Sequence, residues 1–110
     1  MSDASHWQHM VDRDVRRATW RLNPACRLHW RHLDGEWLVY ETASGLTHQL
    51  DGIAACTLMC FESDALELDS LLNLAARLLD TPPDNTLVSQ VSEAVRQFQA
   101  LGMLLVRSPA

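Results

Sequence analysis

The sequence predicts an α+β domain in which a three-stranded antiparallel meander is followed by three helices. Apolar residues alternate with a period of two from Cys26 to Leu50, and they recur at every third or fourth position from there to Leu101. Turn-forming pairs of residues separate the segments of the first half, as a meander requires. Neither layer buries its apolar side alone, so one face of the sheet should lie on the helices.

Three strands are expected between residues 26 and 50. Leu28 and Trp30 alternate with Arg and His neighbours, as in a half-buried strand. The second strand, Trp37–Tyr40, is rich in aromatic and branched residues. The pair Asp34-Gly35 favours a tight hairpin turn between these two strands. The third strand, Leu46–Leu50, places Leu, His and Leu on one face.

Three helices are expected after the meander. Asp51 is a suitable N-cap for a helix over Gly52–Phe61. A second helix runs from Leu68 to about Leu79, and Pro82-Pro83 terminates it because proline lacks the N–H donor. The third helix begins near Asp84–Thr86. Its apolar stripe consists of Leu87, Val91, Val95, Phe98 and Leu101.

The two ends of the chain differ in character. Residues 1–19 have too few apolar positions to anchor a helix, so we expect a mobile arm or a loosely docked helix there. Residues 20–107 are expected to form the domain. Gly102 is placed to cap the third helix. The apolar segment Met103–Val106 either adds a short strand or seals the core.

Composition narrows the class of protein. The chain has 110 residues, of which 47% are hydrophobic, and this suits one globular domain. It contains no signal-peptide pattern and no run of roughly 18 apolar residues, so a soluble, cytoplasmic protein without membrane contact is expected. The formal net charge of −5 disfavours general nucleic-acid binding. All six arginines of the first half lie within residues 1–32, so a basic end remains for an anionic partner.

No catalytic, metal or cofactor site is expected, and the protein is predicted not to be an enzyme. Cys56 and Cys60 share one helical face, where they would form either small core residues or, with His48, a thiol or metal site. Their apolar surroundings favour the core. His29 and His32 face opposite sides of a regular strand, which disfavours a shared metal. The four glycines are isolated, so no phosphate-binding loop is expected.

One feature favours binding of another chain. Leu46–Leu50 is short and comes last in the meander, which predicts an edge strand with unpaired backbone groups. Val88 and Ala94 lie beyond the apolar stripe of the third helix. An edge strand beside a partly apolar helix makes a groove for an extended peptide. Alternatively, these residues complete the core or form a dimer.

Several segments resemble the PqqD-like family over residues 20–106. Ser44-Gly-Leu-Thr-His-Gln-Leu50 is the most specific of them, and it is similar to the branch associated with an HPr-kinase-related system, the HPr-rel-A type. The other segments are Trp20-Arg-Leu, Leu28-His-Trp30, Gly35-Glu-Trp37-Leu-Val-Tyr40 and Leu101-Gly102-Met-Leu. The sequence departs from PqqD at Phe61-Glu-Ser-Asp64, where PqqD has an acidic residue and a glycine. The arm before Trp20 has no counterpart.

The resemblance implies a winged-helix-like fold and a role as a peptide chaperone, also called a RiPP recognition element. Such proteins bind the leader of a ribosomally made precursor peptide by strand addition. They then present it to a modifying enzyme, and the likeness to the HPr-rel-A type implies an HPr-kinase-related one. The peptide-binding residues that the resemblance implies are Leu46, Thr47, His48, Gln49 and Leu50 on the third strand and Val88, Val91, Ser92 and Val95 on the third helix.

Two alternatives remain open at this point. Three helices and a small sheet also describe a winged-helix nucleic-acid-binding regulator, although residues 84–101 carry Arg96 as their one cation against two acids. An uncovered third strand also permits a homodimer, formed by edge-strand pairing or by exchange of the arm.

Overall fold

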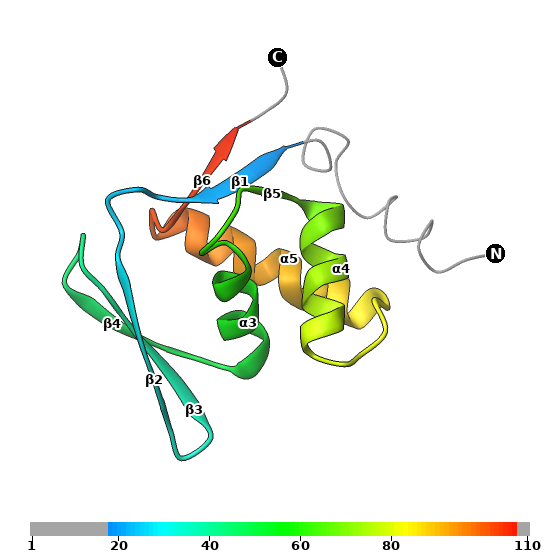
Figure 1. Ribbon diagram of the computed structural model, residues 1–110, viewed down its shortest axis with the longest axis horizontal. Coiled ribbons are helices and arrows are strands. Elements are labelled where there is room, and N and C mark those ends of the chain that lie inside the picture. The colour runs from blue at the N-terminus through cyan, green and yellow to red at the C-terminus, as the bar shows by residue number, and fades with distance from the viewer. Residues whose placement is uncertain (1–17, 108–110) are drawn as a thin grey trace.

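The structure is a computed structural model that describes residues 18–107, and it confirms the α+β, winged-helix-like class (Figure 1). Antiparallel strands precede three helices, and short strands also lie before, between and after them. The elements are β1 (Thr19–Leu22), β2 (Leu28–Leu33), β3 (Glu36–Glu41), β4 (Leu46–Leu50), α3 (Gly52–Cys60), β5 (Leu66–Glu67), α4 (Leu68–Leu78), α5 (Asn85–Ala100) and β6 (Leu104–Arg107). The arm expected at residues 1–19 lies almost entirely outside the described residues, and β1 begins at its last position.

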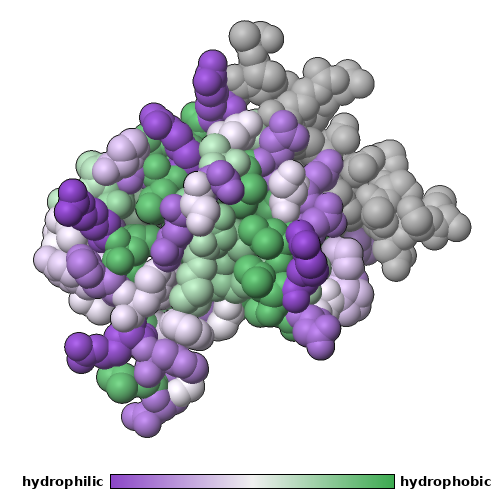
Figure 2. Space-filling model, in the orientation of Figure 1, coloured by the Kyte–Doolittle hydropathy of each residue, from purple (hydrophilic) through white to green (hydrophobic). Residues whose placement is uncertain are grey.

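The expected meander is the sheet β2-β3-β4, antiparallel throughout. Asp34 and Gly35 have φ angles of 52° and 78°, which are the positive values of the predicted hairpin turn between β2 and β3. Val39, at the centre of the middle strand, is fully buried. The tip of this hairpin projects from the domain as a mostly hydrophilic lobe (Figure 2).

A second small sheet, ordered β5-β1-β6, was not expected in full. A short strand was one of two expectations for Met103–Val106, and β6 confirms it by pairing antiparallel with β1. Strands β1 and β5 were missed because segments of two to four residues carry no measurable period. This sheet joins the two ends of the domain, since Trp20 pairs with both Leu66 and Val106.

The helix ends follow the predicted capping chemistry. The Asp51 carboxylate accepts a hydrogen bond of 2.7 Å from the backbone N–H of Ala54 at the start of α3. Asp84 does the same for Leu87 in α5, at 2.9 Å. Gly102, with φ of 78°, follows α5 and lets the Met103 N–H return to the Phe98 carbonyl oxygen at 2.9 Å.

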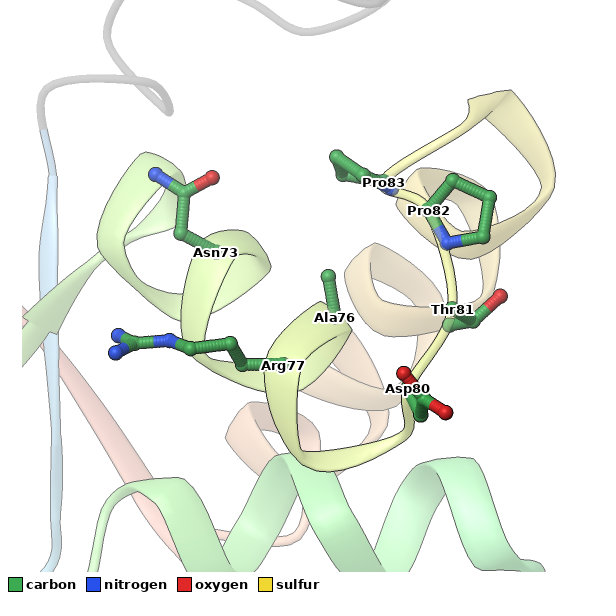
Figure 3. Close-up of a pocket in the computed structure, with 7 residues that line it drawn as sticks. All are labelled: Asn73, Ala76, Arg77, Asp80, Thr81, Pro82 and Pro83. Carbon is green, nitrogen blue, oxygen red and sulfur yellow. The ribbon is translucent and has the colours of Figure 1, made fainter.

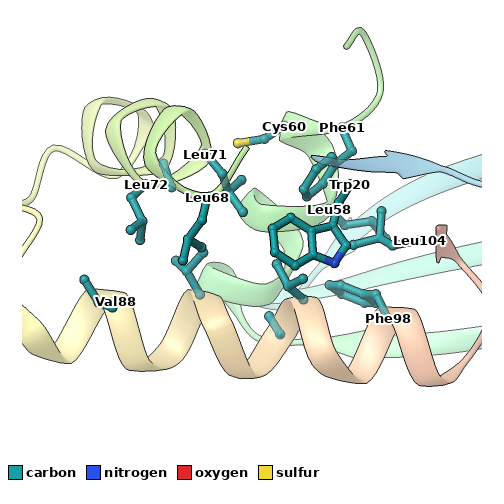
Figure 4. Close-up of a cluster of buried hydrophobic side chains, with 14 of the residues drawn as sticks. Trp20, Leu58, Cys60, Phe61, Leu68, Leu71, Leu72, Val88, Phe98 and Leu104 are labelled. Carbon is teal, nitrogen blue, oxygen red and sulfur yellow. The ribbon is translucent and has the colours of Figure 1, made fainter. Parts of the chain in front are cut away.

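The core lies between the helices and is closed by β1 and β6. Helix α3 contacts α4 and α5 as well as strands β3 and β4. Figure 4 shows α4 facing α5 across Leu68, Leu72 and Val88, with Trp20 and Phe98 at the other end of the cluster. The Trp20 indole N–H donates to Gln99 Oε1 at 3.1 Å, which ties β1 to α5. Within residues 18–107, no helix has the length and apolarity required to cross a bilayer.

Candidate functional site

Strand β4 has one paired edge and one open edge among the described residues. In an antiparallel ladder, successive residues direct their backbone groups to opposite sides. The Thr42 N–H donates to the Arg27 carbonyl oxygen at 3.1 Å, which turns the even-numbered residues of β3 toward β2. The odd-numbered residues of β3 therefore face β4, where their partners are Leu46, His48 and Leu50. It follows that Thr47 and Gln49 direct their N–H and C=O groups to the open edge.

The side chains of β4 divide between two faces of the sheet. Leu46, His48 and Leu50 share the face that carries buried Val39, because cross-strand partners lie on the same side. Leu50 packs against the core, His48 is half-buried and Leu46 is 55% exposed. Thr47 and Gln49 are exposed on the opposite face. A strand added at this edge would continue the same alternation beside the helices.

A buried carboxylate braces the turn that starts β4. Glu41 is 3% exposed, and its carboxylate accepts hydrogen bonds from the backbone N–H groups of Ala43 and Ser44 and from the Ser44 hydroxyl. The Ser44 hydroxyl is the main reason that the pKa of Glu41 falls from its usual 4.5 to about 2, against the opposing effect of burial. Burial and this neighbouring carboxylate raise the pKa of the Cys26 thiol to about 11. The pair Ser44-Gly45, which begins the segment that resembles the PqqD-like family, therefore has a structural role in the turn.

A hollow of about 280 Å³ begins where β4 ends. Asp51 directly follows β4, so the hollow reaches from the end of the pairing strand to α5. Its floor is apolar and wholly or partly buried, and its rim is polar and exposed. The floor consists of Ile53, Ala54 and Ala94, and the rim consists of Asp51, Ser89, Gln90, Glu93 and Gln97.

The α5 residues that the resemblance implied lie elsewhere. Val88, Val91 and Val95 are 0–3% exposed and belong to the core cluster, so they offer no free surface in this state. Ser92 is half-buried, and its hydroxyl oxygen has no hydrogen-bond partner within the described chain. Their contact with a peptide stays a prediction that would require α5 to move. The α5 residues that line the hollow after β4 lie instead on a neighbouring face of this helix, from Ser89 to Gln97.

The helical periodicity of α5 already indicated that Val91 and Val95 would be buried. The apolar stripe of α5 already included Val91 and Val95, and a helix directs one stripe toward its core. Val88 and Ala94 are also buried, so they complete the core. Leu101, the last residue of the predicted stripe, is 55% exposed because α5 ends at Ala100. Glu41 carried no such signal, since its burial depends on the conformation of the turn.

The candidate thiol and metal residues do not form a common metal site among the described residues. Cys60 is buried and Cys56 packs against the core; burial raises the pKa of both thiols, for Cys60 to about 12 with a further contribution from Cys56. Such thiols remain protonated at neutral pH. His29 pairs with Tyr40 and His32 with Trp37, which puts the two histidines on opposite faces. Over the described range, no three metal-ligating side chains gather.

A larger hollow of about 610 Å³ lies at the end of α4. It is lined by Asn73, Ala76, Arg77, Asp80, Thr81, Pro82 and Pro83. Figure 3 shows the Arg77 guanidinium directed away from the loop that contains Pro82 and Pro83. The polar groups that line this hollow therefore do not converge on one point. Convergent polar groups are what distinguish a binding site from a surface depression. The β4 edge with its adjoining hollow is therefore the better candidate.

Comparison with known proteins gives one match of fold. No protein-family model matches the sequence, and the search of curated proteins finds no match. The solved structure of TbiB1 in complex with the TbiA(beta) leader peptide is similar to this chain, with a TM-score of 0.56 and 13% sequence identity. The similarity covers 76% of this chain and 93% of that chain. It shows a shared fold, while membership of the PqqD-like family stays a prediction.

Proposed function

We propose that this protein is a non-enzymatic recognition module that binds the leader of a ribosomally made precursor peptide and presents it to a modifying enzyme. The observation that carries the proposal is the edge of β4 at Thr47 and Gln49, whose backbone groups have no strand partner within residues 18–107 and lie next to a hollow. The fold shared with TbiB1, which was solved with a leader peptide, supports it. The resemblance of Ser44–Leu50 to the PqqD-like family points the same way.

Backbone pairing alone would not hold such a peptide. Thr47 and Gln49 together offer two donors and two acceptors, and each hydrogen bond contributes about 1 kcal/mol net. Association costs about 4 kcal/mol or more. These contributions nearly cancel, so contacts made by the peptide's side chains must supply the affinity and the specificity. The hollow at the end of β4 is the place available for them.

A substitution on the open edge tests the mode of binding. Proline is tolerated in an edge strand where its missing N–H would face solvent. Thr47→Pro should therefore preserve the fold and weaken binding of the leader peptide encoded near this protein's gene by about fivefold or more, as measured by calorimetric titration. His48→Pro is the contrasting variant, because its N–H faces β3. It should destabilise the domain by about 1–3 kcal/mol, because it removes a ladder hydrogen bond and leaves the carbonyl acceptor on β3 unpaired.

The binding surface is mapped by titrating isotope-labelled protein with the same peptide and following amide chemical shifts. The proposal expects the largest shifts in residues 46–51 and along the exposed face of α5. Shifts confined to the β2–β3 hairpin or to β1 and β6, or undiminished binding by a folded Thr47→Pro protein, would refute it. Pairing of two copies through β4 would appear as concentration-dependent shifts of the same residues without peptide.

A further inference from the structure

We infer that the hollow at the end of β4 receives a lysine or arginine side chain of the bound peptide. This inference rests on the proposed function and names the peptide chemistry that the site selects. The two charged groups in the lining, Asp51 and Glu93, are both acidic. The remaining rim groups are Ser89, Gln90 and Gln97, whose side-chain oxygens accept hydrogen bonds.

The shape of the lining suits a long basic side chain. Ala94 is buried, and Ile53 and Ala54 are half-buried, so the floor is apolar. Lysine and arginine carry an aliphatic stem that packs on such a surface while the charged head stays at a polar rim. A large hydrophobic side chain would pack on one isoleucine and two alanines but would make no use of the two carboxylates at the rim.

Both carboxylates are available to a new partner. Asp51 is an exposed residue, and it uses only one carboxylate oxygen, Oδ1, to cap α3. Glu93 lies 3.4 Å from Arg96, but the two side chains are 59% and 73% exposed. Exposed pairs of this kind contribute about 0–1 kcal/mol and exchange readily. Arg96 does not line the hollow, so it competes with the peptide for Glu93 from outside.

A side chain of a peptide paired with β4 can reach the hollow. In an added strand, every second side chain would lie on the sheet face of Val39, beside Leu46, His48 and Leu50. We call this the inner face. Leu50 immediately precedes Asp51 in the chain. A peptide paired with Thr47 and Gln49 therefore brings one inner-face side chain to the end of β4, where the hollow begins. The inference predicts a single basic position in fixed register with the paired segment.

The test uses a displayed library of random 12-residue peptides, selected on the full chain. Peptides whose binding is lost with Thr47→Pro should share lysine or arginine at one aligned position. A synthetic peptide from that set should bind about threefold to fivefold more weakly when its basic residue is replaced by norleucine, which keeps the stem and removes the charge. Equal binding of the two peptides, or enrichment without a basic position, would overturn the inference.

Variants of the protein locate the effect. Glu93→Gln and Asp51→Asn should each weaken the lysine peptide and leave the norleucine peptide unchanged; asparagine retains the α3 cap. Arg96→Ala should strengthen the lysine peptide because it removes the competing cation. Glu36→Gln, the same chemical change on exposed β3, is the matched control and should have no effect. Equal loss with Glu36→Gln would reduce the effect to net charge and contradict the site.

The same experiment separates this inference from the proposed function. Peptides that depend on the β4 edge but lack a basic position would uphold strand addition and overturn only the basic anchor. Selection of no peptide that responds to Thr47→Pro, together with no binding of the genetically neighbouring leader, would overturn both.

Discussion

Glu41 is a charged residue whose burial serves the conformation of a neighbouring strand. Its carboxylate has three donors in the turn that precedes β4, and the nearby Cys26 thiol also contributes to the lowered pKa of Glu41. A buried carboxylate is tolerated when hydrogen bonds replace its lost hydration. The sequence marks Ser44 and Gly45 as turn residues, but the partner that fixes the turn lies at the end of the preceding strand.

Glu41→Gln should lower the free energy of unfolding by about 1–3 kcal/mol at pH 7, because the amide replaces one acceptor oxygen with a donor. The lowered pKa of Glu41, from 4.5 to about 2, makes the wild-type advantage depend on pH. The stabilisation is complete above pH 4.5 and is lost as the pH falls toward 2. Urea unfolding of both proteins at pH 7, 4 and 3 should show the difference shrinking; a constant difference would contradict the charged state.

Asp80 is a non-glycine residue with a φ of 50°, at the end of α4. The Thr81 N–H reaches the Ala76 carbonyl oxygen at 3.0 Å, a helix termination in which glycine is the favoured residue. Asp80→Gly should therefore raise the free energy of unfolding by about 0.5–1 kcal/mol. Thermal unfolding measures the change. Asp80→Ala, which keeps a β-carbon without a polar group, should not be stabilised, and a stabilised alanine variant would contradict the assignment.

At the scale of elements, α5 shows what helical periodicity can and cannot establish. The spacing of Leu87, Val91, Val95 and Phe98 correctly predicted the buried face. The family resemblance then implied a peptide-contacting role for Val91 and Val95, which the same stripe commits to the core. The exposed face has no pattern of its own, because polar residues at Ser89, Gln90 and Gln97 are typical of any solvated helix. Its relation to β4 arises only from packing.

The second sheet depends on contacts between the two ends of the domain. Strand β1 precedes β6 by more than 80 positions in the chain, and each has four residues. Hydrophobic periodicity reflects local order, so it predicts the meander and the helices but not the pairing of β1 with β6. The link through Trp20 and Gln99 is likewise a tertiary contact between residues 79 positions apart.

Gly102 lies in the turn between α5 and β6. A substitution there tests whether this turn determines the pairing of β6 with β1. Its φ of 78° is unfavourable for other residues, while an added β-carbon would meet no atom within 4 Å. Gly102→Ala should therefore cost about 1 kcal/mol through backbone strain alone, measured by chemical denaturation. A cost several times larger, or an altered circular dichroism spectrum, would show that the turn also determines the pairing of β6 with β1.

At the scale of the whole molecule, the distribution of charge disfavours the alternative function of nucleic-acid binding. The hollow beside α5 is lined by two acids and no cation, and the one arginine of α5 pairs with Glu93. A helix that enters a DNA groove needs cations to replace the released counterions. The nucleic-acid alternative stays a prediction, and it would require salt-dependent duplex binding at physiological ionic strength.

The meander has two outer strands, and the helices make them unequal. By the same alternation, Leu28, Trp30 and His32 direct their backbone groups away from β3, so β2 also offers an open edge within the described chain. Strand β4, however, runs directly into α3 and contacts it. An added strand at β4 gains side-chain contacts as well as backbone bonds, because β4 leads directly to the hollow that begins at Asp51.

Residue-resolved hydrogen exchange distinguishes these edges. In the free protein, the Thr47 and Gln49 amides should exchange quickly, while His48 and Leu50, whose N–H groups face β3, should be protected. With the leader peptide bound, Thr47 and Gln49 should become protected. The outward amides of β2 should stay fast, because the proposed peptide pairs with the edge of β4, where the adjoining hollow offsets the cost of association. Protection of β2 with β4 unchanged would move the binding edge to the other side of the sheet.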